Sequence, residues 1–136
     1  MSYLLDTNIV SDLIKYPDGL VQQRVLKLGE AQISTSIIVA AELRFGAEKS
    51  GSVVLANKIK EALDRLSVLP LRTPVDTTYA HIRTQLERAG TPIGNNDYLI
   101  ATQAMTYDLT LVTNTVREFS RVEDLQIENW LEDESR

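Results

Sequence analysis

Short apolar runs alternate along this chain with longer stretches in which apolar residues recur every three or four positions. The first run, at residues 3–5, is typical of a strand buried on both faces of a parallel sheet. The next stretch places Ile9, Val10 and Leu13 on one face of a helix, and Pro17 favours a helix end just before it. The same alternation predicts helices at 7–15, 19–28, 37–49, 53–66, 74–89, 97–107 and 117–119, and further strands at 32–35, 67–71, 110–113 and 125–128.

Polar side chains that favour helix N-termini precede several of these helices, because their oxygens accept hydrogen bonds from the first free N–H groups. Thr73-Pro74 adds a proline at the first helical position, where no N–H donor is needed. We expect N-caps at Asp18, Ser36, Ser52 and Thr73. Strands that alternate with helices predict an α/β domain with a central parallel sheet of about 4–5 short strands and helices on both faces.

The length of 136 residues fits one domain, which we expect to span residues 1–131 and to be followed by a solvated acidic tail at 132–136. The apolar fraction of 43% and the charged fraction of 24% are those of an ordinary globular protein. No apolar run approaches the roughly 20 residues of a membrane-spanning helix, and the N-terminus lacks the features of a secretory signal. The sequence therefore predicts a cytoplasmic protein without membrane association.

Residue types limit the chemistry that the chain can perform. There is no cysteine, which excludes disulfides, thiolate nucleophiles and zinc–thiolate sites. The single histidine, His81, excludes a histidine-rich metal site. The formal charge is 14 − 19 = −5, which argues against tight, sequence-independent binding to a nucleic-acid backbone. That charge does not exclude a nucleic acid that a divalent metal bridges to the protein.

Asp6 follows the first predicted strand directly, which is an expensive place for a carboxylate. Open α/β sheets bind their ligands just outside the carboxyl ends of the strands. Asp6 therefore stands where a site is expected. The alternative is that Asp6 or Thr7 only caps the following helix.

Glu42 and Asp97 also have apolar neighbours on their predicted helices. Ile38 and Phe45 stand four residues before and three residues after Glu42, so we expect Glu42 on the core-facing side. Ile100 stands three residues after Asp97, which opens its helix, where an anion is favoured. For Asp97 a capping role is the alternative.

Three carboxylates beside apolar surface suggest that they converge on one site. Crowded carboxylates resist ionisation, and a divalent cation removes that penalty. Oxygen ligands without cysteine or histidine suit magnesium or manganese, which commonly serve phosphoryl chemistry. The end of the strand at 110–113 adds Thr113 and Asn114 as hydrogen-bonding groups and Glu118 as a further anion; for Glu118 the alternative is a surface glutamate beside Arg117.

Four ordered motifs carry these residues. They are Asp6-Thr7-Asn8, Ala41-Glu42-Leu43-Arg44-Phe45-Gly46, Ile93-Gly94-Asn95-Asn96-Asp97-Tyr98-Leu99-Ile100-Ala101, and Leu111-Val112-Thr113-Asn114 with Arg117-Glu118-Phe119. In order and spacing they resemble the motifs of PIN-domain ribonucleases, and more narrowly those of VapC toxins of type II toxin–antitoxin systems. The resemblance covers nearly the whole chain, including its length and the closing Glu128-Asn129-Trp130.

The resemblance implies a PIN-domain fold and a Mg²⁺-dependent endoribonuclease, with Mn²⁺ as a substitute and transfer RNA as a target class. Asp6, Glu42 and Asp97 match the acidic metal-binding positions of the family, which makes them the expected catalytic residues and metal ligands. Asn8, Thr113, Asn114 and Glu118 are expected to support them. The implied partners are a VapB-type antitoxin that covers the active site, a second copy of the toxin, and operator DNA bound only through the antitoxin complex.

The chain departs from the family pattern at Thr115, where many PIN domains carry a fourth acidic residue; Glu118 or a water is expected to compensate. A degenerate PIN domain that binds RNA without cutting it is one alternative. A phosphatase of the haloacid dehalogenase type resembles Asp-x-Asp after the first strand, and Asn8 replaces its second acid. A receiver-like signalling domain would need an acidic pair after the first strand and a late lysine, and Thr113-Asn114-Thr115 supplies no lysine.

Overall fold

Five short parallel strands form the centre of the molecule in the computed structural model, which describes residues 2–132. Their order is β3-β2-β1-β4-β5, so the first strand of the chain lies in the middle of the sheet. All pairings are parallel, as the sequence predicts. The strands are β1 (Tyr3–Leu5), β2 (Ile33–Ser36), β3 (Ser67–Leu69), β4 (Thr110–Val112) and β5 (Ile127–Glu128).

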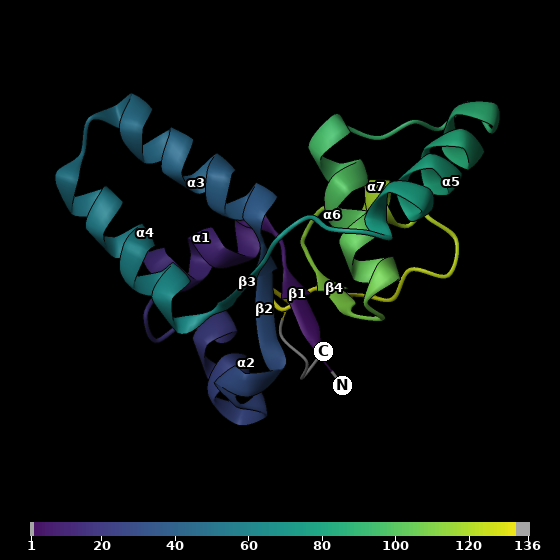
Figure 1. The fold of residues 1–136 in the computed structure, drawn as a ribbon. Coiled ribbons are helices and arrows are strands. Elements are labelled where there is room, and N and C mark those ends of the chain that lie inside the picture. The colour runs from purple at the N-terminus through teal and green to yellow at the C-terminus, as the bar shows by residue number, and fades with distance from the viewer. Residues whose placement is uncertain (1, 133–136) are drawn as a thin grey trace.

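Helices cover both sides of this sheet, with α1, α3 and α4 on one side and α5 and α6 on the other (Figure 1). α3 and α4 pack against each other as a helical hairpin, and α5 packs closely on α6. The helices are α1 (Thr7–Lys15), α2 (Leu20–Leu28), α3 (Ile37–Ser50), α4 (Val53–Arg65), α5 (Val75–Arg88), α6 (Asn95–Thr106) and α7 (Val116–Phe119), with a 3-10 turn η1 (Glu30–Gln32). The predicted α/β architecture is confirmed.

The chain reverses its direction of winding at β1. This strand pairs with β2 on one side and with β4 on the other, and Leu5 aligns with Thr35 and with Val112. Parallel sheets of this kind leave a crevice outside the carboxyl ends of the strands at such a reversal, and ligands bind there. The residues that follow β1 and β4, Asp6 and Thr113, therefore lie at the place where a ligand is expected.

The middle of the sheet is the most deeply buried part of the core. Leu4 and Leu5 of β1 and Leu111 and Val112 of β4 are all 0% exposed. Burial of a leucine side chain contributes about 2 kcal/mol of stability. Strands buried on both faces hold their carboxyl ends in place, so side chains placed there have a rigid support.

Several helix starts differ from the sequence prediction. α2 begins at Leu20 with Gly19 as its N-cap, so Asp18 lies one residue before the cap position. α5 begins at Val75 after Pro74, which leaves Thr73 too far away to cap it. In both helices the residue at the N-cap position, Gly19 or Pro74, makes no side-chain hydrogen bond to the helix.

The sequence predicted the ends of the first helix correctly and placed the start of α6 two residues late, because Asn95 and not Asp97 is its first residue. Among residues 2–132 no helix is both long and apolar enough to cross a membrane. Residues 133–136, most of the expected acidic tail, lie outside the described residues. The division of the chain into 1–131 and 132–136 stays a prediction.

The N-cap of α3 is confirmed and gives a stability prediction. The Ser36 side chain is 0% exposed and accepts a hydrogen bond from the Ile38 N–H at 3.0 Å. Ser36→Ala leaves that donor without its partner, so we expect unfolding to become easier by about 1 kcal/mol and the Tm to fall by about 4 °C. Ser11→Ala, on the exposed surface of α1, is the matched control and should leave the Tm nearly unchanged. Equal melting of wild type and Ser36→Ala would contradict the capping role.

Candidate active site

Asp6 is a buried carboxylate held by two hydrogen bonds. Its side chain is 4% exposed. The Thr113 hydroxyl donates to Oδ2 at 2.7 Å, and the Thr7 N–H donates to Oδ1 at 2.8 Å. Burial raises the pKa of Asp6, and the hydrogen bonds from Thr113 and Thr7 lower it in part. Asp6 is also the N-cap of α1, so the capping alternative is confirmed, and a catalytic role for Asp6 stays a prediction.

The loop from β4 to α7 is tied to the start of α1 by a small polar network. The Asn8 amide donates to the Thr115 hydroxyl at 3.2 Å and accepts from the Asn114 N–H at 3.3 Å. The Thr115 N–H donates in turn to the Thr113 hydroxyl at 3.0 Å. Two loops that are far apart in the sequence are thereby fixed to each other, which holds the Thr113 hydroxyl against Asp6.

Glu42 lies at the edge of the buried side of α3. Leu43 beside it is buried, whereas Phe45 is 67% exposed. The expectation that Phe45 lies with Glu42 on the core-facing side is therefore wrong, because the helix turns Phe45 away from the core. Glu42 is half-buried and accepts from the Thr7 hydroxyl at 3.3 Å and from the Asn96 amide at 3.4 Å. These are long hydrogen bonds, so the carboxylate keeps capacity for another ligand.

Asp97 occupies the first turn of α6, where the helix dipole favours a negative charge. Its pKa is raised to about 6, first by burial and then by the negative charges of Asp6, Glu118 and Glu42. A hydrogen bond with Glu118 raises it further. Asp97 therefore lies within electrostatic reach of the other three carboxylates. Gly94 helps to form it, because a Cβ there would lie 3.3 Å from the Asp97 carboxylate.

Glu118 belongs to this cluster and is not an isolated surface residue. It is half-buried on α7 and interacts with Asp97. None of the ion pairs within residues 2–132 involves any of the four carboxylates. The site therefore holds a formal charge of about −4 when all four are ionised, with no basic side chain of the described region bonded to them.

This donor set fits a hard divalent cation. No three Asp, Glu or His side chains in the described part of the chain form a group that could hold a metal ion alone. Magnesium needs no such group, because it keeps several waters and is commonly bound by one or two carboxylates. Asp6 and Asp97 interact electrostatically and both have raised pKa values, so a cation beside them would relieve the cost that burial and repulsion impose on their charged forms.

All site residues that the sequence predicted lie in the part of the chain that the structure describes. Asp6, Glu42, Asp97 and Glu118 converge, Thr113 and Asn8 hold the loops, and Asn114 contributes its backbone N–H and not its side chain. The sequence argument missed Asn96 and Thr115 as hydrogen-bonding partners. Polar residues next to Asp97 and Thr113 were the available signal, but their partners lie on distant elements.

Comparison with known proteins agrees with this geometry. Residues 3–125 match the PIN domain family. Ribonuclease VapC2 of Rickettsia felis is 40% identical over 132 residues, which cover 96% of this chain and 98% of the relative. The tRNA(fMet)-specific endonuclease VapC of Salmonella typhimurium is 35% identical over 131 residues, with 96% and 98% covered.

Solved structures agree as well. VapBC2 from Rickettsia felis bound to a DNA fragment from their promoter contains a chain with a TM-score of 0.88 and 38% identity, covering 96% of this chain and 99% of that one. DNA-bound VapBC from Salmonella typhimurium gives a TM-score of 0.86 and 34% identity, with 96% and 98% covered. Because the family match and these relatives span nearly its whole length, the chain belongs to the PIN-domain family and, within it, to the VapC ribonucleases.

Proposed function

We propose that this chain is the toxin of a type II toxin–antitoxin pair and acts as an endoribonuclease that hydrolyses phosphodiester bonds of RNA. The observation that carries the proposal is the convergence of Asp6, Glu42, Asp97 and Glu118 at the carboxyl ends of β1 and β4. Repelling carboxylates with few hydrogen-bond donors suit a divalent cation and an anionic substrate. Named relatives that are ribonucleases support the same function.

PIN-domain nucleases generally depend on a divalent metal, and we propose Mg²⁺ for this chain, with Mn²⁺ as a substitute. The support is the donor set, which contains only oxygen ligands. Asp6 and Asp97 would bind the metal directly, and Glu42 directly or through water. Glu118, beside Asp97, takes the place of the acidic residue that the family pattern puts at Thr115.

A bound metal would supply a positive charge for a phosphate oxygen and for the attacking water. The protein supplies the positions. Thr113 and the Thr7 N–H fix both oxygens of Asp6, so that this carboxylate keeps one orientation. Thr7 and Asn96 hold Glu42 from two different elements. Asp97 loses its proton at a pH of about 6, so its affinity for a cation rises as the pH passes that value.

Partners follow from the relatives. Several of their solved structures are VapBC complexes, some with DNA, so we propose a VapB-type antitoxin for this chain and operator contact through that complex only. Transfer RNA is the proposed target class, because a relative is a tRNA(fMet)-specific endonuclease. The cytoplasmic location expected from the sequence stays a prediction.

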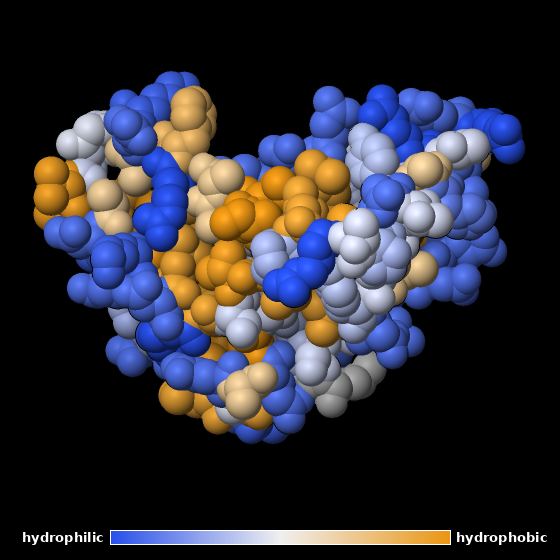
Figure 2. Space-filling model, viewed as in Figure 1, coloured by the Kyte–Doolittle hydropathy of each residue, from blue (hydrophilic) through white to orange (hydrophobic). Residues whose placement is uncertain are grey.

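A homodimer is supported by exposed apolar surface. Figure 2 shows hydrophobic residues gathered in the hollow between the α3–α4 side and the α5–α6 side of the molecule. Ile37 and Phe45 of α3, the helix that borders this hollow, are 43% and 67% exposed. Contiguous apolar surface of this kind typically marks an interface, and we propose that a second copy covers it.

Cleavage is expected to depend on the carboxylates. Asp6→Asn and Asp97→Asn should each lower the rate of RNA cleavage by on the order of 100-fold or more, because loss of an outer partner of a metal already costs 10–100-fold. Total cellular RNA, incubated with the purified protein and Mg²⁺ or a chelator, gives the rate and, by end mapping, the cut positions. Asp76→Asn, in the exposed first turn of α5, is the matched control and should cut like wild type.

Wild-type rates for either active-site variant would remove these residues from the mechanism. A folded wild-type protein that bound RNA but did not cut it with Mg²⁺ or Mn²⁺ would support the alternative of a PIN domain that binds RNA only, with Thr115 as the first position to restore to an acid.

The raised pKa of Asp97 predicts a pH-dependent stability. Because the pKa of about 6 in the folded protein exceeds the ordinary value of 3.8 for an aspartate, the metal-free protein loses stability as the pH rises from about 4 to about 6. Asp97→Asn removes this penalty. In chelator at pH 7.5, the free energy of unfolding of the variant should therefore be about 1–2 kcal/mol higher than that of wild type. This figure is already lowered because solvent screens the half-exposed side chain.

Urea unfolding measures this difference, which should vanish near pH 4, where the wild-type carboxyl is neutral. Millimolar Mg²⁺ should stabilise wild type more than Asp97→Asn, since only the wild type offers the full ligand set. Asp76→Asn again serves as control. A metal-free variant less stable than wild type at pH 7.5 would mean that Asp97 has a stabilising structural partner.

A further inference from the structure

A groove leads from the carboxylate cluster along α1. It has a volume of about 550 Å³ and runs between α1 and the α3–α4 hairpin, which lie beside each other (Figure 1). Thr7 and Glu42, which belong to the site, line one part of it, and Lys15 and Lys58 line another. A second groove of about 420 Å³ shares both lysines and continues toward Arg65, so the lysines stand where the two grooves meet.

Lys15 and Lys58 share these grooves with the acidic side chains Glu42 and Glu61, but are paired with neither of them within residues 2–132. Both side chains are exposed, and within residues 2–132 neither forms an ion pair with an acidic side chain. Lys60, two residues from Lys58, is by contrast bonded to Asp64 at 3.0 Å. The Lys15 ammonium lies 5.6 Å from the centre of the Tyr16 ring.

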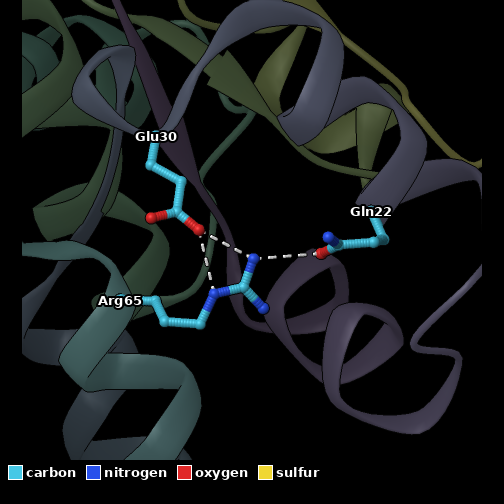
Figure 3. A network of polar contacts seen from close by, with 3 residues as sticks. All are labelled: Gln22, Glu30 and Arg65. Atoms are coloured by element: carbon cyan, nitrogen blue, oxygen red, sulfur yellow. Dashed lines mark hydrogen bonds and ion pairs between the residues drawn. The ribbon is translucent and has the colours of Figure 1, made fainter.

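Arg65, which lines the second groove, is a cation with a structural role. Its guanidinium donates to Glu30 at 2.9 and 3.0 Å and to Gln22 at 3.3 Å, which ties α4 to α2 and η1 (Figure 3). The positive charge of Arg65 is thereby balanced within the protein. The charges of Lys15 and Lys58 remain available for a ligand.

The substrate creates a need for such charges. A protein with a net charge of −5 and four carboxylates in its active site repels a polyanion, and one bound cation neutralises only part of that repulsion. Nucleic-acid backbones are held by lysine and arginine side chains that displace counterions from the phosphates. Lysines at the other end of the groove that starts at the carboxylate cluster meet this requirement.

The distance along α1 suits contacts next to the cleaved bond. Lys15 follows Thr7 by eight residues, a rise of about 12 Å along the helix. The floor between the two ends contains Ile14 and Leu55, which are partly buried. An unpaired strand presents both a charged backbone and the flat apolar faces of its bases, so the lysines and this floor match its two kinds of surface.

We propose that Lys15 and Lys58 are positioning residues that bind backbone phosphates of a single-stranded RNA segment beside the cleaved bond, with the bases against Ile14 and Leu55. The inference rests on the proposed ribonuclease function and adds the path of the substrate to it. A peptide with acidic and apolar side chains is the other occupant that this groove would suit, and the experiment separates the two.

The test is the salt dependence of RNA binding. A short unstructured RNA oligonucleotide is titrated with Asp97→Asn protein, which should not cut it, between about 50 and 300 mM salt. Loss of two phosphate contacts in Lys15→Gln/Lys58→Gln should lower the slope of log K against log salt by about 1.4 and weaken binding about 10-fold at low salt. Lys15→Arg/Lys58→Arg should keep the slope, since the charge remains.

The matched control is Lys27→Gln/Lys49→Gln, which removes the same charge from exposed lysines outside both grooves. With cleavage-competent protein, Lys15→Gln/Lys58→Gln should raise KM and leave kcat close to that of wild type. A slope equal to that of the control pair overturns the proposal, and so does a variant that binds RNA normally but binds an acidic amphipathic peptide more weakly. Failure of wild type to cut RNA would overturn the proposed function. The salt dependence of RNA binding would still show whether Lys15 and Lys58 contact phosphates.

Discussion

Repulsion among carboxylates at the carboxyl ends of β1 and β4 is the constraint around which this molecule is arranged. Asp6 is buried, and the charges of Asp6, Glu118 and Glu42 together with burial bring the pKa of Asp97 to about 6. This repulsion lowers the stability of the fold in the absence of a cation, and a bound cation would restore that stability. In the proposed function, the same repulsion that weakens the metal-free fold would be relieved by a bound metal ion.

The buried centre of the sheet holds these carboxylates in place despite their repulsion. β1 lies between β2 and β4 in the fully buried centre of the sheet, so Asp6 and Thr113 cannot move apart without disrupting the core. Asp6, Glu42, Asp97 and Glu118 come from the ends or first turns of different elements, and weak hydrogen bonds from Thr7 and Asn96 orient Glu42 without neutralising it. Free lysines at the far end of the adjoining groove supply the positive charge that the site itself lacks.

The sequence was sufficient for what depends on local pattern. The buried run at Tyr3–Leu5, the helix Thr7–Lys15 and the cap at Ser36 follow from periodicity and from the chemistry of one or two side chains. What depends on tertiary packing could not be predicted. Three observations depend on elements that are distant in the chain. They are the contact of Asn96 with Glu42, the half-buried position of Glu118 beside Asp97, and the presence of Lys15 and Lys58 in one groove. The cap at Gly19 and the outward turn of Phe45 were missed for the same reason.

The most direct test of the central claim is the titration of the Asp97 carboxyl carbon by NMR, without metal and with Mg²⁺. A cluster of repelling carboxylates that binds a divalent cation predicts a pKa of about 6 without metal and a clear fall when Mg²⁺ is added. The fall should disappear in Asp6→Asn, which removes the neighbouring ligand. An ordinary pKa near 4 that Mg²⁺ leaves unchanged would contradict the account, because neither the repulsion nor the metal would then act at this site.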